Sequence, residues 1–285
     1  MLNSSLIPSP QMIDYILLFI AVSAVSTASI FAVLASAPGI VASFWRFAIS
    51  SAVFLVLYRK FPVDRKTLRY SVFAGFFLAV HMSSWIESLF HASVALSTAI
   101  VTTHSIFSGI FARFAGERLK ANEVVGVVVA IAGIYLLSGA DFYADIYGIV
   151  MAFVGAISGG LYFTTAKFAR NVEFREYITS TYLFASITTF AFSIITETPL
   201  TGYPQETYIF LALLALIPMS AGHTILNYLI RRMKVITVTG SVLGEVVGST
   251  ILSIIILEQK LKPIAYLYLT LILFGIYIAI SRRSS

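Results

Sequence analysis

The sequence has no cysteine and little charge. None of its 285 residues is Cys, and 11% are Asp, Glu, Lys or Arg, whereas soluble domains carry roughly 25% charged residues. The lack of cysteine excludes disulfides, thiolate metal sites and a cysteine nucleophile. Because so few charged residues cannot cover a soluble domain, the composition also excludes a cytosolic enzyme, a nucleic-acid binder and a disordered protein.

Motifs that indicate several other functions are missing as well. The chain has no P-loop, which argues against ATP-driven transport by this chain alone, and no His-Glu-x-x-His zinc motif. It also lacks a carbonyl-rich filter motif of the kind found in ion channels. We therefore expect no metal, no cofactor and no nucleic-acid partner.

What the sequence does contain is apolar residues, at 59% of the total and with a mean hydropathy of +0.92. A helix needs ~20 mostly apolar residues to cross a bilayer. Such runs predict ten spans, near residues 14–34, 40–58, 68–90, 94–112, 121–138, 146–167, 177–196, 206–229, 235–257 and 264–281. No Lys or Arg precedes the first run, so it lacks the basic region of a cleavable signal and is expected to remain as a span. The chain is predicted to be an all-α integral membrane protein.

The basic residues fall unevenly on the two sides of this arrangement. With ten spans, sixteen of the nineteen Lys and Arg residues lie on one side, Lys260 and Lys262 lie on the other, and Arg46 is inside the second span. Lys and Arg favour the cytoplasmic side of a membrane. We therefore expect a cell-membrane protein with both termini in the cytoplasm. The sixteen residues are Arg59, Lys60, Arg65, Lys66, Arg69, Arg113, Arg118, Lys120, Lys167, Arg170, Arg175, Arg231, Arg232, Lys234, Arg282 and Arg283.

The two halves of the sequence resemble each other at an offset of 141 residues. Val94–Ala95–Leu96–Ser97 matches Val235–Ile236–Thr237–Val238, and Glu117 matches Glu258. A repeat of five helices is odd in number, so its second copy enters the membrane inverted. We therefore predict an N-terminal repeat over 1–140 and an inverted C-terminal repeat over 141–285. Inverted repeats around a central site are typical of secondary transporters that work by alternating access.

Several short motifs occur in a recognisable order. They are Ser43–Phe44–Trp45–Arg46–Phe47, Val94–Ala95–Leu96, Gly116–Glu117–Arg118–Leu119 and Ala132–Gly133–Ile134–Tyr135–Leu136–Leu137. In this order and spacing the chain resembles the EamA-type family of the drug/metabolite transporter superfamily. The resemblance implies ten helices in two inverted halves, with helices 1–4 and 6–9 around a central cavity and helices 5 and 10 at the periphery. It also implies export of amino acids or other small metabolites. The chain departs from the family at His104–Ser105 and Glu245–Val246, where relatives commonly have a proline and a kink.

Three ionisable residues lie near the predicted midplane of the membrane. His81, His104 and Glu245 are each about ten residues from a membrane face, or ~15 Å at 1.5 Å per residue. A charge at the centre of a span costs about 2.5–3.5 kcal/mol, so such residues usually face a cavity or a partner. His104 and Glu245 are also repeat equivalents, 141 residues apart. Because histidine titrates near neutral pH, we interpret these two residues as a pair that shares a substrate or a proton.

Helical spacing adds further candidates for the cavity. Trp85 shares a face with His81, Asn227 shares one with His223, and Ser26 belongs to a polar stripe of the first span. The predicted substrate-binding residues are Ser26, His81, Trp85, His104, His223, Asn227 and Glu245. An alternative for Trp85 is a lipid-facing anchor at the membrane surface.

Other residues have both a structural and a functional interpretation. Arg46 either clamps a substrate carboxylate or holds helices together through carbonyls and Glu87; we favour the structural role. Ser158–Gly159–Gly160 and Pro218 are either gating bends or packing features.

These features predict a secondary transporter, and the family resemblance implies that it exports amino acids or related amphipathic metabolites. Its partners are the lipid bilayer, a small-molecule substrate and, as a hypothesis, protons. Two alternatives remain: an intramembrane enzyme that uses His81, His104 and Glu245, and a passive metabolite channel. An enzyme alters its substrate chemically, and a channel shows no exchange acceleration by substrate on the far side.

Overall fold

The computed structural model describes residues 10–59, 64–92, 97, 100–137, 145–256 and 262–281, and within them the regular elements are all helices. Eight helical segments are long and apolar enough to cross a membrane. They are Gln11–Ala35, Gly39–Tyr58, Arg65–His91, Ile146–Asn171, Phe174–Ile195, Gln205–Ile230, Val235–Ile256 and Pro263–Ile280. The expected fifth span is a shorter apolar helix, Ala121–Leu137. The expected fourth span lies partly outside the described residues, which include its end, His104–Ala112.

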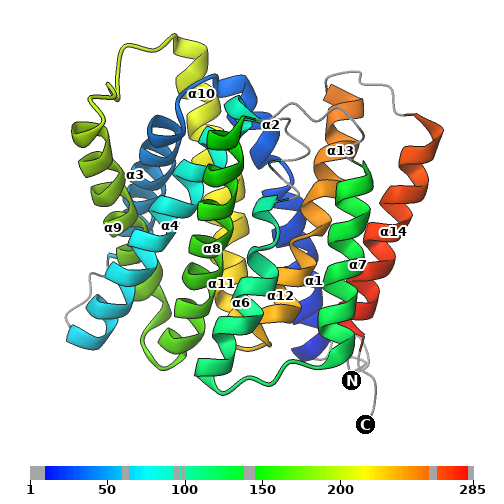
Figure 1. Cartoon of the computed structure of the whole chain (residues 1–285). Helices are drawn as coiled ribbons and strands as arrows, with labels where there is room; N and C mark the ends of the chain where they lie inside the picture. Colours follow the sequence, from blue (N-terminus) through cyan, green and yellow to red (C-terminus); the bar gives the residue numbers. More distant parts are fainter. Residues whose placement is uncertain are drawn as a thin grey trace, which may run out of the picture.

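Several of these segments consist of more than one helix (Figure 1). The first is α1 (Pro10–Val25) and α2 (Ala28–Ala35), and the second and third are α3 (Gly39–Tyr58) and α4 (Arg65–His91). Then follow α6 (His104–Ala112), α7 (Ala121–Leu137), α8 (Ile146–Phe168) and α9 (Phe174–Ile195). The next segment is α10 (Gln205–Leu214), a π-helical stretch (Ala215–His223) and α11 (Thr224–Ile230). The last helices are α12 (Val235–Ser241), α13 (Gly244–Ile256) and α14 (Pro263–Ile280).

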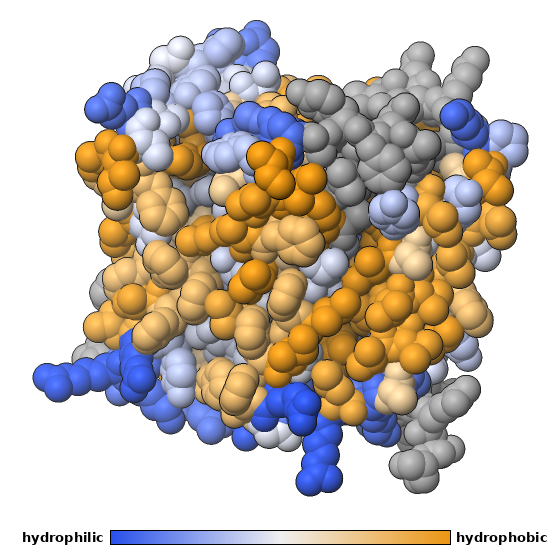
Figure 2. Space-filling model, in the orientation of Figure 1, coloured by the Kyte–Doolittle hydropathy of each residue, from blue (hydrophilic) through white to orange (hydrophobic). Residues whose placement is uncertain are grey.

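The surface of the molecule is divided as a membrane protein requires. In Figure 2, apolar side chains cover the middle of the visible face and hydrophilic ones gather at its two ends. One of these ends, which we call the basic end, carries the connections α6–α7, α8–α9 and α11–α12. Contacts join these connections directly: Lys167 Nζ donates to Met233 O and Lys234 Nζ to Arg118 O. Of the basic residues expected on this side, Lys60, Arg282 and Arg283 lie outside the described residues, as does Lys260 of the other side.

Several contacts between helices have a counterpart in which each helix is replaced by the helix at the same position in the other half of the chain. The packing of α4 on α8 corresponds to that of α1 on the π-helical stretch, and α3 on α9, α6 on α12 and α7 on α14 are contacts between matching positions. The matches at Val94–Ala95–Leu96 and Glu258, and the predicted junction at 140/141, lie outside the described residues. In Figure 1, α7 and α14 lie side by side at one edge of the molecule. Their backbones approach closely at Gly126 and Gly275, where a Cβ would collide with the facing helix.

Three of the membrane segments are interrupted near their middles. The interruptions lie at Ser26–Thr27, Thr102–Thr103 and Val242–Leu243. At each of them backbone bonds run to the third preceding residue, as from Thr103 N to Ile100 O and from Glu245 N to Val242 O, which tightens the helix locally. Hydroxyl groups also bond to nearby carbonyls at the first two points. The second interruption directly precedes His104–Ser105, and one residue separates the third from Glu245–Val246, so the expected prolines are not needed for a break there.

The two proposed bending sites behave differently. Pro218 lies in the π-helical stretch and interrupts regular α-helix. In contrast, α8 runs without interruption through Ser158–Gly159–Gly160. A Cβ at Gly159 would collide with the His81 ring, and one at Gly160 with Phe107. These two glycines therefore serve close packing of α8.

Candidate functional site

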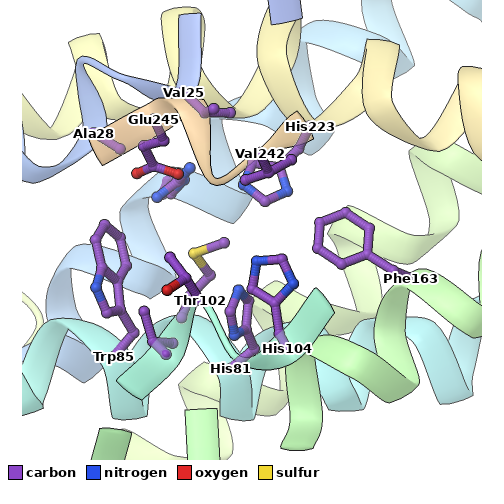
Figure 3. A pocket seen from close by; sticks show the side chains of 13 residues that line it. Val25, Ala28, His81, Trp85, Thr102, His104, Phe163, His223, Val242 and Glu245 are labelled. Atoms are coloured by element: carbon purple, nitrogen blue, oxygen red, sulfur yellow. The ribbon is translucent and has the colours of Figure 1, made fainter. Parts of the chain in front are cut away.

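The interruptions meet at a small cavity in the middle of the molecule. Its volume is about 30 Å³, which is room for about one water molecule and not for a metabolite. Figure 3 shows the side chains around it converging from several helices. The lining residues are Val25, Ala28, Arg46, His81, Met82, Trp85, Val101, Thr102, His104, Phe163, His223, Val242 and Glu245.

Arg46 of α3 is the cation of this cavity. Its side chain is 0% exposed, and its Nε donates to the Met219 sulfur at 3.2 Å. Within the described parts of the chain, the two terminal nitrogens of the guanidinium have no hydrogen-bond partner. Arg46 lies on a buried polar face of α3 with Ser43 and Ser50, and Ser50 donates to Ala215 O at 3.0 Å. This face fixes α3 against the π-helical stretch and leaves the end of the guanidinium available.

Glu245 supplies a carboxyl group to the same cavity. It follows the interruption at Val242–Leu243 in the first turn of α13, and its carboxylate points into the cavity (Figure 3). No hydrogen bond or ion pair to this carboxylate comes from the described residues, although Arg46 acts on it electrostatically. The cavity is therefore lined by a guanidinium and a carboxyl group that do not form an ion pair with each other.

Three histidines form the other wall. His81 Nδ1 lies 2.7 Å from Gly155 O, and the His81 and His104 rings meet edge to face with centroids 5.8 Å apart. The His223 ring stacks on Phe163 at 5.9 Å. Nδ1 of His104 and of His223 have no hydrogen-bond partner. In Figure 3, His81 and His104 lie side by side and Glu245 lies across the cavity from them. The predicted pair His104 and Glu245 thus lines one cavity without a direct bond between them.

The remaining predicted residues divide into two groups. Trp85 is buried, lines the cavity and has an unpaired Nε1, so it is not a lipid-facing anchor. Ser26 and Asn227 are buried but do not line the cavity. The Ser26 hydroxyl donates to Val22 O at the first interruption. The Asn227 amide donates to the Tyr162 hydroxyl and to His223 O, and so positions the residues behind the histidine wall.

The expected tie between Arg46 and Glu87 is not formed. Glu87 Oε2 accepts a hydrogen bond from Gly39 N at 3.1 Å, and Oε1 lies 3.6 Å from His91 Nε2. His91 also contacts Asp145, the N-cap of α8, at 2.9 Å. The Gly148 N–H bond, followed by the His91 contact, lowers the pKa of the Asp145 carboxyl. Glu87 therefore belongs to a polar cluster at the end of the molecule opposite the basic end, away from Arg46.

At the basic end, three ion pairs form among the described residues. Lys167 Nζ lies 2.7 Å from Glu117 Oε1, and Glu117 Oε2 accepts from Val235 N at 2.9 Å. Lys234 Nζ lies 2.6 Å from Glu123 Oε1. A third pair joins Arg232 to Asp14 at 3.0 Å, and this bond raises the pKa of Arg232. Each pair joins a residue before position 140 to one after it, so the two halves are tied together below the cavity.

A family model described as "EamA-like transporter family" matches this chain twice, over residues 12–139 and 146–281. The chain belongs to the EamA-like transporter family. The resemblance to the drug/metabolite transporter superfamily, of which this family is part, is thereby confirmed. Membership points to a membrane transporter of small molecules rather than to an enzyme.

Two further comparisons agree with the family. A segment of 76 residues is 37% identical to an "Uncharacterized transporter" of Archaeoglobus fulgidus, and covers 27% of this chain and 26% of that protein. A solved structure described only as "Crystal structure of protein" superposes on this chain with a TM-score of 0.78. The superposition covers 93% of this chain and 96% of the solved one, and the two sequences are 18% identical. At this identity the superposition concerns the fold alone.

In this EamA-like chain, the sequence favours a structural role for Arg46, whereas the structure places its side chain on the cavity. Its placement on the cavity follows from the polar face that it shares with Ser43 and Ser50, three and four residues away, and this spacing is visible in the sequence. Phe163, by contrast, carries no polar signal and is an ordinary apolar residue of α8. Among the described residues, no group of three His, Asp or Glu side chains has a geometry that fits a metal ion.

Proposed function

We propose that this chain is a secondary transporter that exports amino acids or related amphipathic metabolites from the cytoplasm by alternating access. The observation that carries the proposal is a cavity with unpaired charges where three membrane segments are interrupted, between the two segments that match the family model. Interrupted helices at the interface of two repeats are where secondary transporters bind substrate.

The proposal includes the topology. The chain crosses the cell membrane ten times, as two inverted five-helix repeats over 1–140 and 141–285, with the basic end and both termini in the cytoplasm. The gathering of Lys and Arg residues at one end supports this orientation. The paired helix contacts, such as α3 on α9 and α7 on α14, support the relation between the halves.

The small size of the cavity supports alternating access. A space of about 30 Å³ cannot hold an amino acid, so a substrate enters only after the helices around it move. The ion pairs at the basic end join the two halves and close this conformation towards that side. Their release opens the cavity to the cytoplasm, and their formation accompanies opening to the outside.

The substrate-binding residues of the proposal are His81, Trp85, His104, His223 and Glu245, with Ser26 and Asn227 in supporting positions. The Trp85 indole and the imidazole rings provide flat surfaces and polar edges for an amphipathic molecule. Glu245 and His104 are the groups proposed to carry a coupling proton. The absence of any bond from the described residues to the Glu245 carboxylate supports this role, because protonation then breaks no contact.

The test is transport by purified Glu245→Gln protein in proteoliposomes. Counterflow of a labelled apolar amino acid, with and without a pH gradient, separates exchange from proton-driven accumulation. We expect the variant to lose the response to the pH gradient, about tenfold or more. Glu87→Gln is the matched control, since Glu87 is a glutamate of a membrane segment that lies at the end of the molecule, away from the cavity. Full uptake by Glu245→Gln with an unchanged pH response would remove the proton role, and no counterflow by the unaltered chain with any metabolite would contradict transport.

A further inference from the structure

We infer that Arg46 and Glu245 form a receptor for a zwitterion, in which the guanidinium binds the carboxylate of the substrate and the glutamate binds its ammonium group. This inference rests on the proposed transport function and deepens it. It assigns the substrate class, a free α-amino acid with an apolar side chain, and it gives Arg46 a direct binding role.

The first observation is the unsatisfied guanidinium. Arg46 is fully buried in the middle of the molecule, and both its terminal nitrogens lack a partner. A buried charged donor without an acceptor is strongly unfavourable, so the arrangement calls for an occupant that supplies one. The fork of a guanidinium matches the two oxygens of a carboxylate, which it binds through two parallel hydrogen bonds.

The second observation is that Glu245 faces the same cavity and is also without a bond from the described residues. Arg46 and Glu245 act on each other electrostatically but are not joined by an ion pair. Opposite charges that line one space without touching suit a ligand that carries both charges close together. A singly charged ligand would leave one of the two protein charges uncompensated, which is costly in a low-dielectric site.

The rest of the lining suggests the side chain of the ligand. Val25, Val101, Val242, Met82 and Ala28 provide apolar surface next to the charged pair. An apolar side chain is stabilised on such surface, whereas a charged one finds no further counter-ion there among the described lining residues. The carboxylate of Glu245 binds either a proton or an ammonium group at one time, so this role is compatible with the proposed proton coupling.

The test uses ligands that differ by one charge. L-leucine carries both charges, leucinamide lacks the carboxylate, and isocaproate (4-methylpentanoate) lacks the ammonium group. In proteoliposomes of the unaltered chain, we expect counterflow of labelled leucine, methionine or phenylalanine. We expect leucine to compete about 10- to 100-fold more strongly than either analogue, the range of one charged hydrogen-bonded contact. This comparison needs no variant and so does not depend on the folding of one.

Two variants then assign the contacts. In Arg46→Gln the advantage of leucine over leucinamide disappears, and in Glu245→Gln the advantage over isocaproate disappears. Glu87→Gln and Arg175→Gln are the matched controls, because Glu87 bonds to Gly39 N and Arg175 is exposed beside Tyr58; both should keep the full discrimination.

The outcomes separate this inference from the proposed function. Equal competition by leucine and both analogues overturns the zwitterion site, as does exchange of an uncharged metabolite such as a sugar or nucleoside with no exchange of the three amino acids. In both cases transport itself stands. If no metabolite exchanges at all, the proposed function and the inference fail together. Loss of both advantages in Glu87→Gln or Arg175→Gln contradicts the assignment to Arg46 and Glu245.

Discussion

The same kinds of side chain are unpaired in the centre of this molecule and paired at its basic end. In the centre, the Arg46 guanidinium has two nitrogens without partners and Glu245 has no bond from the described residues. At the basic end, Glu117 binds both Lys167 and the backbone of Val235. The Arg46 side chain is fully buried, and an unsatisfied polar group is most costly where water cannot replace the missing partner.

This difference separates two tasks. Paired charges between the halves hold the two halves together, and in the proposed transport cycle they separate when the cavity opens. Unpaired groups that line a small cavity destabilise the protein without ligand and are satisfied by a ligand. Proteins commonly carry such destabilising groups at functional sites, where activity and stability oppose each other. The comparison therefore predicts that removing charge has opposite effects on stability in the two regions.

The largest expected effect follows from replacing Arg46 by Met, an apolar residue of similar length. A charge at the middle of a membrane segment costs about 2.5–3.5 kcal/mol, which corresponds to a Tm about 5–10 °C higher for Arg46→Met without ligand. Thermal unfolding of the purified protein in detergent measures it. Arg232→Met is the control at the basic end, where Arg232 bonds to Asp14 and Tyr228, and its Tm should fall by about 1–3 °C. A lower Tm in both variants would remove the distinction between the regions.

The second prediction concerns the basic end. Glu117→Gln removes the carboxylate that binds Lys167 and Val235 N. The ion pair is well shielded from water, because the Lys167 and Glu117 side chains are only 9% and 11% exposed. Loss of a contact of this kind is worth about 1.5–3 kcal/mol, so the cavity should open to this side about 10- to 100-fold more often. Because the chain has no cysteine, a single Ala28→Cys in the cavity lining reports this opening through its rate of reaction with a membrane-impermeant thiol reagent.

Asp14→Asn provides the matched control in the same Ala28→Cys background. Its partner Arg232 is 43% exposed, and exposed ion pairs contribute only about 0.2–1 kcal/mol. The labelling rate should therefore rise less than about fivefold. An equal rise in both variants would mean that burial does not decide the strength of these ties, and no rise in Glu117→Gln would mean that this pair does not close the cavity.

The sequence was sufficient to find the ionisable groups of the cavity but not the backbone that brings them together. Depth in the membrane follows from counting residues, and His81, His104 and Glu245 do line one cavity. The interruption at Thr102–Thr103 could not be inferred, because the similar pair Thr164–Thr165 lies in α8, which is continuous. In α8 too the hydroxyls bond to preceding carbonyls. The Thr103 hydroxyl bonds to the third preceding carbonyl, whereas the two hydroxyls in α8 bond to the fourth. A pair of threonines in the sequence does not reveal which of these bonds forms, so it does not predict whether the helix breaks.

Arg46 shows a second limit of prediction from the sequence, which concerns the partner of a charged side chain. Its burial follows from the polar face with Ser43 and Ser50, but the sequence offered Glu87 as an equally reasonable partner. Glu87 is instead held by Gly39 N at the start of α3, a backbone donor that no residue pattern identifies. The free guanidinium is therefore a consequence of where a different carboxylate finds its hydrogen bond. A partner can be predicted from charge only when backbone donors do not compete for it.

The smallest expected effect tests a charge that is neither central nor at the basic end. Asp145 caps α8 through the Gly148 N–H at 2.7 Å and contacts His91 at 2.9 Å. Asp145→Asn keeps a capping oxygen and removes only the charge, so we expect a Tm about 1–2 °C lower near pH 7.

The pKa of the Asp145 carboxyl is lowered in the folded protein, so its contribution to stability is complete above the ordinary Asp pKa of about 4 and is lost as the pH falls further. Thermal unfolding from pH 7 to pH 3 should show the two proteins converging below about pH 4, with Glu206→Gln, an exposed carboxylate of α10, close to the unaltered chain throughout. A difference that does not shrink as the pH falls would show that Asn fails in the capping geometry, and that the charge of Asp145, unlike the paired charges of the basic end, does not account for the stabilisation.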